Sequence, residues 1–469
     1  MSRSGAGSTI IALCGGARGP TVTQMQAERQ DNVVAAAMEA AAAKAGVKGN
    51  VVITKPTVLG AHVVQILNPG VSLPAAAKGM RYRSTRSADA DNTFKHAVMR
   101  GLAPDGGLFV PETIPKISAE EMASWRNLQF PSLACKIMSK YIGVDEIPSA
   151  ALESIVFKSY QTFSTTHVTP LVKMSDDGTT YVLEQFHGPT AAFKDVALQF
   201  LGNLFEYFLE SENADAAEGE EKRITVLGAT SGDTGSAAIE GLRGKKNVEV
   251  YILHPKNRVA PVQEAQMTTV LDDNVHNVSV EGSFDDCQSM VKTMFNDEEF
   301  RSRHGLAAIN SINWARIMAQ IVYYFYAYFR FLDDVQGTGT GGAGSSGTVP
   351  KLNFVVPSGN FGNALAGFYA REMGLGINKL VVATNQNDIL FRFMQFADYT
   401  SRPVKPSLAP AMDIVVPSNF ERFLFWLFDN DPSVLASAMD SIKNKGLMSL
   451  GEREQKCMDK IHSIFEAGR

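Results

Sequence analysis

Twice in this chain, a run of β-branched and apolar residues precedes a polar glycine loop that opens into a helical pattern. The first strand pattern is ITVL (Ile224–Leu227), with the loop GATSGDTG at 228–235 and a helix from Ser236. The second is LNFVV at 352–356, with the loop PSGNFGN at 357–363 and a helix over 364–373. Strands that alternate with helices favour an open parallel sheet with helices on both faces. Ligands of such sheets bind beyond the carboxyl ends of the strands, where both loops fall.

The two glycine loops have the chemistry of anion sites. A loop that opens a helix exposes several backbone N–H groups, and the helix dipole adds partial positive charge, so it suits phosphate or carboxylate. Neither loop matches GxxxxGK[ST] or GxGxxG, so neither carries a nucleotide signature. A tight turn without a ligand also explains one such loop. The Ser, Thr and Asn residues between the glycines favour ligand contact.

A third motif, HGPTAAFKD at 187–195, introduces a helix with one apolar stripe. Lys194 is predicted to lie in its first turn, where a cation opposes the helix dipole and the lysine pKa falls. A neutral amine is what Schiff-base chemistry requires. A solvated surface lysine fits the same pattern, so spacing alone leaves both interpretations open.

Composition excludes several classes of protein. The 469 residues are 45% hydrophobic and 20% charged, which is typical of a globular chain, and a net charge of −5 gives no basic field for nucleic acid. The most apolar stretch, 309–332, contains Asn, Gln and Arg and is expected to be an aromatic core helix, with no membrane span. The four cysteines form no close pair and no two histidines have metal-ligand spacing, so we expect no metal and a reducing, cytoplasmic compartment.

The two ends of the chain differ from its middle. Residues 1–79 hold an Ala-rich run and early arginines, so we expect an extension, with an organellar transit peptide as the alternative. The acidic stretch 211–222 and the Gly/Ser-rich stretch 337–349 are predicted to be surface loops. The last residues, 456–469, are predicted to form an amphipathic helix.

Eight ordered blocks between residue 80 and about residue 430 resemble threonine synthases of the long form, similar to fungal and proteobacterial enzymes. They are RYRSTR (81–86), LAPDGGLFVPE (102–112), HGPTAAFKD (187–195), GATSGDTG (228–235), SINWARIMAQIVYYF (311–325), PSGNFGN (357–363), ATNQND (383–388) and MDIVVPSNFERF (412–423).

The resemblance implies the α/β fold of type II pyridoxal 5′-phosphate (PLP) enzymes, with two open, largely parallel sheets flanked by helices and an additional N-terminal region. It implies a family-like N-terminal domain at 80–165 and a PLP-binding core at 166–469. The implied activity is that of a carbon–oxygen lyase, which converts O-phospho-L-homoserine and water to L-threonine and phosphate. The expected oligomeric state is a monomer or homodimer.

The resemblance also implies roles for particular residues. Lys194 would bind PLP covalently and move protons. The cofactor phosphate would be held by the backbone of Gly359, Asn360, Phe361, Gly362 and Asn363. The substrate carboxylate or its surroundings would contact Thr230, Ser231, Gly232, Asp233 and Thr234. Three further residues would contribute at the substrate end, namely Ser84, Thr85 and Arg86. Asn387 and Asp388 would give indirect support, and His187 is expected to be structural.

One difference from the family concerns the end of the chain. Similar enzymes carry a DPHTAVG-like segment whose threonine contacts the PLP ring nitrogen, and no such segment occurs between 423 and 469. A truncated sequence and a replaced ring-nitrogen partner both explain this. Two alternative functions remain open, a phospho-lyase that releases a 2-oxo acid from the same kind of substrate, and a non-catalytic protein with the PLP-enzyme fold.

Overall fold

The computed structural model describes residues 2–3, 10–11, 79–87, 91–174, 180–217, 219–336, 350–407, 409 and 412–468. Contacts between Cα atoms divide the chain into two units, Met1–Ala77 and Lys78–Arg469. In the first unit, β1 (Ser2–Arg3) pairs antiparallel with β2 (Ile10–Ile11). The predicted extension and the Gly/Ser-rich insert at 337–349 otherwise lie outside the described residues.

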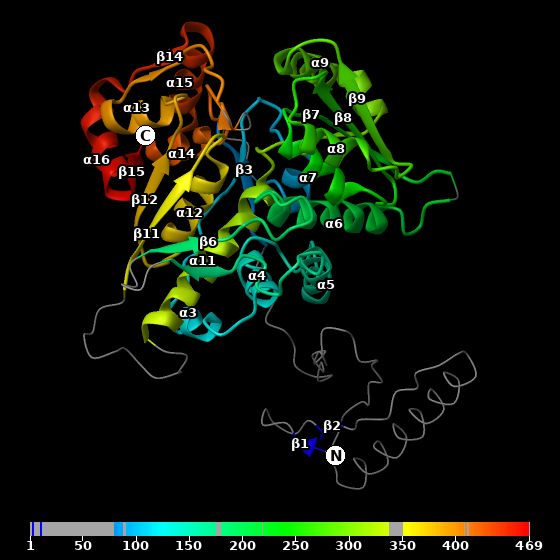
Figure 1. The fold of residues 1–469 in the computed structure, drawn as a ribbon, viewed down its shortest axis with the longest axis horizontal. Helices are drawn as coiled ribbons and strands as arrows, with labels where there is room; N and C mark the ends of the chain where they lie inside the picture. The colour runs from blue at the N-terminus through cyan, green and yellow to red at the C-terminus, as the bar shows by residue number, and fades with distance from the viewer. Residues whose placement is uncertain are drawn as a thin grey trace. The chain divides into compact units, whose positions relative to one another are not determined.

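The first sheet of the second unit contains four parallel strands in the order β10-β7-β8-β9. Their bounds are β7 Ile224–Ala229, β8 Val248–Pro255, β9 Val275–Val280 and β10 Leu306–Ala307. The helices that follow or flank these strands are α6 Asp195–Glu212, α7 Asp233–Leu242, α8 Pro261–Thr268, α9 Phe284–Asn296 and α10 Glu298–Arg303. Figure 1 shows this sheet and its helices in green.

The second sheet has the order β11-β12-β15, and its pairs are also parallel. Its strands are β11 Leu352–Pro357, β12 Ile377–Ala383 and β15 Phe465–Gly468. The helices around it are α12 Gly362–Glu372, α13 Ile389–Phe396, α14 Phe420–Leu427, α15 Pro432–Lys445 and α16 Glu454–Ile464. The two parallel sheets flanked by helices confirm the predicted fold class.

The remaining elements are short strand pairs and the helices of the N-terminal part. The strand pairs are β3 Tyr82–Ser84 with β4 Phe109–Pro111, β5 Leu171–Lys173 with β6 Tyr181–Leu183, and β13 Tyr399–Thr400 with β14 Leu447–Met448. The helices are α2 Phe94–Arg100, α3 Ala119–Trp125, α4 Phe130–Met138 and α5 Ser149–Tyr160.

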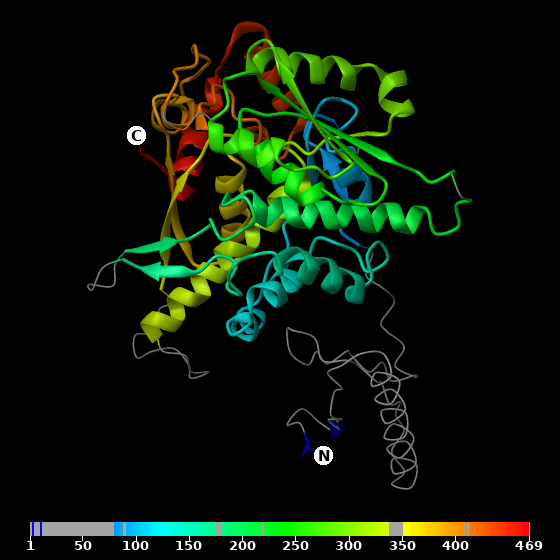
Figure 2. The same cartoon turned by 45° about the vertical axis from the view of Figure 1, so that its right-hand side comes forward.

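Helix α11 (Trp314–Gln336) is the central element of the core. All of its first 16 residues are buried, and its apolar faces pack against α4, α6 and α12. It is therefore the aromatic core helix that the sequence predicts. Its far end is fixed by Asp334, which accepts hydrogen bonds from Lys173 and Tyr181 on the β5–β6 hairpin, the pair of strands that projects from the body in Figure 2. None of the described helices is apolar over a length that could cross a membrane.

Three element boundaries differ from the sequence-based expectation. Helix α7 begins at Asp233 and α12 at Gly362, so each loop is shorter than predicted. The prediction of a helix to the end of the chain was wrong, because α16 ends at Ile464 and the next four residues form β15. These four residues join the edge of the second sheet beside β12, where ladder hydrogen bonds replace those of another helical turn.

Candidate active site

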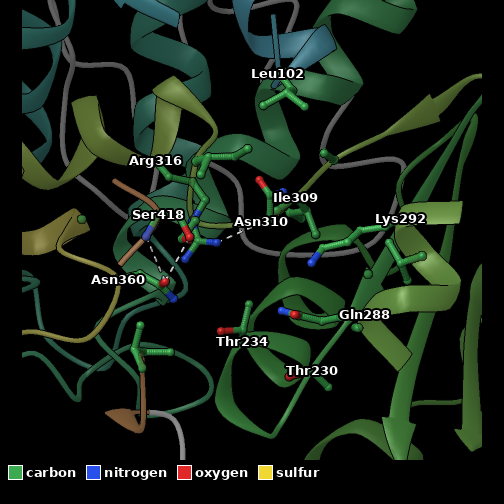
Figure 3. Close-up of a pocket in the computed structure, with 18 of the residues that line it drawn as sticks. Leu102, Thr230, Thr234, Gln288, Lys292, Ile309, Asn310, Arg316, Asn360 and Ser418 are labelled. Carbon is green, nitrogen blue, oxygen red and sulfur yellow. Dashed lines mark hydrogen bonds between the residues drawn. The ribbon is translucent and has the colours of Figure 1, made fainter. Parts of the chain in front are cut away.

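A cleft of about 1650 Å³ lies at the carboxyl ends of β7 and β11. Its wall contains Lys194, Arg86 and residues of both glycine loops. Figure 3 shows Thr230, Thr234 and Gln288 on one side of this cleft and Arg316, Asn360 and Ser418 on the other. Three segments far apart in the sequence thus meet at one site, as expected for an open parallel sheet.

Lys194 is the residue that immediately precedes α6. Its Nζ donates to Asp233 Oδ1 at 2.6 Å and to Thr234 Oγ1 at 2.7 Å, and 13% of its side chain is exposed. Asp195, the next residue, is buried and accepts hydrogen bonds from the backbone and side chain of Thr190. This carboxylate fixes the turn before α6 and so fixes the position of the lysine.

The pKa of Lys194 is lowered from that of an ordinary lysine, mainly because burial penalises the ammonium form. The Asp233 carboxylate opposes this shift, whereas the nearby positive charge of Arg316 adds to it. The predicted direction is therefore confirmed, but the physical causes are burial and Arg316. The amine is poised for reactions that need its neutral form.

The loop after β7 has its own internal hydrogen bonds. Thr230 Oγ1 accepts from the N–H groups of Gly232 and Gly235, so Thr230 shapes the loop. Gly232 has φ +152°, and a Cβ there would collide with Gln263, so only glycine fits. Ser231, Asp233 and Thr234 line the cleft, and the Asp233 carboxylate is already paired with Lys194.

The loop after β11 is anchored by a buried aromatic side chain. Phe361 has left-handed backbone geometry (φ +64°) and is buried, with its ring against those of Phe420, Phe423 and Phe465. This packing compensates for a backbone conformation that costs a non-glycine residue roughly 1–2 kcal/mol.

The polar residues of the same loop also have partners. The Asn363 side chain donates to Pro357 O and accepts from Ala364 N, and Asn360 Oδ1 accepts from Ser418 Oγ at 3.1 Å. Gly359, Asn360, Gly362 and Asn363 line the cleft at the start of α12.

Of the three residues predicted at the substrate end, Arg86 lines the cleft, whereas Ser84 and Thr85 are fully buried. Arg86 Nε and Nη2 donate to the two oxygens of Glu421 at 2.9 and 2.7 Å. Thr85 Oγ1 donates to the same carboxylate at 2.6 Å. Ser84 Oγ accepts from the backbone N–H of Arg86, so Ser84 and Thr85 both help to position Arg86.

Three other residues named from the sequence, Asn387, Asp388 and His187, do not line the cleft and instead bond to other side chains. Asn387 donates to Asp413, which also accepts from Asn385 and Ser407, so Asp413 is tied to the segment that follows β12. Asp388 pairs with Arg392 on α13. His187 bonds to Glu184 and Ser164, which fits the expected structural role. Among the described residues, no group of histidine, cysteine and acidic side chains is placed to hold a metal.

Sequence reasoning missed Arg316, which lies in the first turn of α11 and lines the cleft. It is 3% exposed, and its Nε has no hydrogen-bond partner. Within the sequence it interrupts an apolar stretch and stands in the block SINWARIMAQIVYYF, to whose residues no role was assigned.

These residues fit the PLP that the sequence implies. The buried amine of Lys194 can bind an aldehyde, and the loop at the start of α12 offers backbone N–H groups for a phosphate. A Cβ at Gly362 would lie 3.4 Å from Ile317 and Asn419, so this part of the cradle has little room for a side chain. Arg316, whose Nε has no hydrogen-bond partner, adds a buried positive charge on the same side of the cleft as Asn360.

Comparisons with known proteins agree with this geometry. The family described as "Threonine synthase N terminus" matches residues 81–160, and "Pyridoxal-phosphate dependent enzyme" matches residues 163–438. A threonine synthase of Eremothecium gossypii is 52% identical over 395 residues, which are 83% of this chain and 74% of the relative.

Two solved structures are also similar over most of the chain. The crystal structure of threonine synthase from yeast has a TM-score of 0.76 at 47% identity, and the match covers 83% of this chain and 76% of that one. The PLP-bound threonine synthase from Brucella melitensis has a TM-score of 0.75 at 42% identity, over 83% of this chain and 78% of that one. With a buried lysine in a cleft lined by two glycine loops and relatives at this level of identity, the chain belongs to the threonine synthase family of pyridoxal-phosphate-dependent enzymes.

Proposed function

We propose that this protein converts O-phospho-L-homoserine and water to L-threonine and inorganic phosphate, as a PLP-dependent lyase. The observation that carries the proposal is the buried amine of Lys194, which contacts the glycine loop after β7 in a cleft that the loop after β11 also lines. A cofactor phosphate and a substrate carboxylate each need such a loop. Family membership supports the same activity.

Bound PLP supplies an electron sink for negative charge that develops at Cα and Cβ of the substrate. The backbone N–H groups of 359–363 would hold its phosphate, and the Lys194 amine would hold its aldehyde carbon until substrate takes that place. The freed Lys194 amine would then remove one proton from Cα and one from Cβ, and phosphate would leave as its bond to Cγ breaks. The two protons would return to Cγ and, at the end, to Cα. Water would add its hydroxyl to Cβ, and its remaining proton would go to the released phosphate.

We propose that the residues of the loop after β7 have different roles in the reaction. The negative charge of Asp233 repels a substrate carboxylate, so Asp233 acts on Lys194, which it already contacts. The substrate carboxylate is then held by the loop N–H groups and the Ser231 and Thr234 hydroxyls, with Arg86 in the wall of the same cleft. Thr230 and Gly232 set the shape of this loop.

The deciding experiment is product analysis with purified protein, PLP and phosphohomoserine. Formation of threonine and phosphate in equal amounts supports the proposal. Phosphate with 2-oxobutyrate identifies the phospho-lyase alternative, and no phosphate release with bound PLP identifies a non-catalytic protein.

The pH dependence of cofactor attachment tests the pairing of Lys194 with Asp233. Only the neutral amine attacks the PLP aldehyde, and the pKa of Lys194 is lowered by burial, so the attachment rate should rise through a midpoint below that of a free lysine. Because Asp233 raises this pKa, Asp233→Asn should move the midpoint to still lower pH. The measurement is the rate of the visible absorbance change when PLP is added to cofactor-free protein. Glu298→Gln, at an exposed carboxylate in the same cleft, is the control, and a midpoint raised by Asp233→Asn contradicts the pairing.

Glu421→Gln tests whether Arg86 acts at the substrate end. Loss of the buried carboxylate removes a two-point charged contact, worth about 1.5–3 kcal/mol, so KM for phosphohomoserine should rise about 10- to 100-fold. PLP affinity should be unchanged. Glu206→Gln, which breaks a pair with Lys158 and Lys245 at a site outside the cleft, is the control. A similar KM in both variants would remove Arg86 from substrate binding.

We also propose a domain boundary, a cellular location and an oligomeric state for this protein. The two family matches meet between residues 160 and 163, which supports a domain boundary near 165. The composition, and the absence of a disulfide among the three cysteines that the structure describes, support a cytoplasmic location. We propose a monomer or homodimer as the oligomeric state.

A further inference from the structure

A second, smaller cavity of about 480 Å³ lies at the carboxyl ends of β11 and β12. Its wall shares Gly359, Met412 and Ile414 with the cleft, so the two cavities adjoin at the glycine loop after β11. The described residues of this wall combine apolar side chains with amides and hydroxyls and include no charged side chain. Such a wall suits a flat, neutral group with a polar edge.

The polar side chains that line this second cavity differ in whether their hydrogen bonds are used. Four of them bond to other groups of the protein, namely Ser358, Asn385, Asn387 and Ser407. Thr384 is the exception, because its Oγ1 is shielded from solvent and has no hydrogen-bond partner among the described residues. A hydroxyl that has neither water nor a protein partner is unfavourable, so it indicates a partner that arrives from outside.

Thr384 is the residue directly after β12, and backbone hydrogen bonds fix it on both sides. In the parallel pair of β11 and β12, the N–H of Ser358 donates to Ala383 O at 3.1 Å. The N–H of Thr384 donates to Gly468 O on β15, also at 3.1 Å. Thr384 is therefore held one strand away from residues 359–363, which would hold the cofactor phosphate.

The covalent structure of PLP indicates which of its groups would face this cavity. The aldehyde is attached to the ring carbon that lies opposite the ring nitrogen. Lys194, which would hold the aldehyde, contacts Asp233 and Thr234 of the loop after β7. Asn360 of the loop after β11 lies across the cleft from Thr234 (Figure 3). A ring that spans this distance would turn its nitrogen away from Lys194 and toward the carboxyl ends of the second sheet.

We propose that Thr384 is the hydrogen-bond partner of the PLP ring nitrogen, with its hydroxyl as the donor. A neutral hydroxyl leaves this nitrogen unprotonated, which tunes how strongly the ring withdraws electrons. The sequence between 423 and 469 holds no DPHTAVG-like segment, and Thr384 supplies the same chemical group from the end of β12. The proposal rests on PLP as the cofactor and not on the product of the reaction.

The first measurement uses binding and needs no turnover. It compares the affinities of the cofactor-free protein for PLP and for its deaza analogue, in which a C–H group replaces the ring nitrogen. The ratio of these affinities should fall about three- to tenfold in Thr384→Val, which keeps the shape of the side chain but loses one neutral hydrogen bond. Thr384→Ser keeps the hydroxyl and should keep the ratio of wild type.

The second measurement is ¹⁵N magnetic resonance of protein loaded with PLP that is labelled at the ring nitrogen. Wild type and Thr384→Ser should show the signal of an unprotonated pyridine. Thr384→Asp places a carboxylate beside the nitrogen, so the nitrogen should take up a proton and its signal should move to the position of a pyridinium ion. This variant decides the matter if Thr384→Val does not fold.

Thr180→Val is the matched control, because Thr180 is exposed next to β6 and lines neither cavity. It should change the affinity ratio less than about twofold. The same ratio in wild type and folded Thr384→Val, or an unshifted ring-nitrogen signal in Thr384→Asp, would overturn the proposal. A protein that shows both effects of Thr384 but forms no threonine contradicts the proposed function alone.

Discussion

Replacement of Lys194 by alanine should abolish both the visible absorbance of the covalently attached cofactor and the formation of threonine. The side chain supplies the only amine that bonds to Asp233 and Thr234 among the described residues, and it both anchors PLP and moves protons. Loss of a general base alone lowers rates about 10²- to 10⁴-fold, and loss of the covalent anchor adds to this. We expect turnover at least about 10³-fold below wild type, measured by phosphate release and threonine analysis.

Lys292→Ala is the matched control, because it removes the same side chain from the outer part of the same cleft. It should keep its absorbance and most of its activity. Normal turnover by the Lys194 variant, with folding verified by circular dichroism, would remove this lysine from the mechanism.

The second large effect is on stability. Gly202→Ala should destabilise the protein, although alanine is favoured over glycine inside a helix by about 1 kcal/mol. The reason is a close approach of two helices, because a Cβ at Gly202 in α6 would collide with the carbonyl oxygen of Gly241 in α7. The same contact is tight from the other side, where a Cβ at Gly241 would lie 2.5 Å from Leu198 O. Overpacking against backbone costs about 1–3 kcal/mol, and we expect the upper end of that range in the free energy of unfolding.

The control for this prediction is an exposed position near the end of the same helix. Ser211→Ala and Ser211→Gly differ in helix propensity but not in packing, so alanine should be the more stable of the two there. An increase in the midpoint of urea unfolding for Gly202→Ala would contradict the prediction, because it would mean that α6 and α7 move apart at little cost in free energy. Because α6 starts directly after Lys194, a displaced helix should also weaken cofactor attachment.

The parts of the fold that follow from local pattern were predictable. The strands at β7 and β11, the loops after them and the amphipathic helix after Lys194 all have a periodicity that local sequence specifies. Their exact bounds depend on tertiary contacts. Helix α12 begins at Gly362 because the Phe361 ring is anchored among Phe420, Phe423 and Phe465, which come from distant parts of the chain.

The candidate site was predictable only where a motif carries it. Lys194, the two loops and Arg316 all stand in recognisable blocks, but the burial of Arg316 and its unpartnered Nε exist only once α11 is packed against the rest of the core. The strand β15 was missed for a similar reason, since four residues carry too little pattern and gain their order from pairing with β12. Likewise, the sequence does not indicate that Glu421 is the partner of Arg86, because 335 residues separate the two.

That pair has a consequence for how the protein is made. Arg86 and Glu421 are separated by 335 residues, so at a synthesis rate of about 5–20 residues per second Arg86 leaves the ribosome roughly 20 s to 1 min before its partner exists. Contacts this distant along the chain form late, because the entropy of closing the loop must be overcome first. A nascent chain therefore displays Arg86 well before the carboxylate that positions it exists, and substrate cannot assist the early stages of its folding.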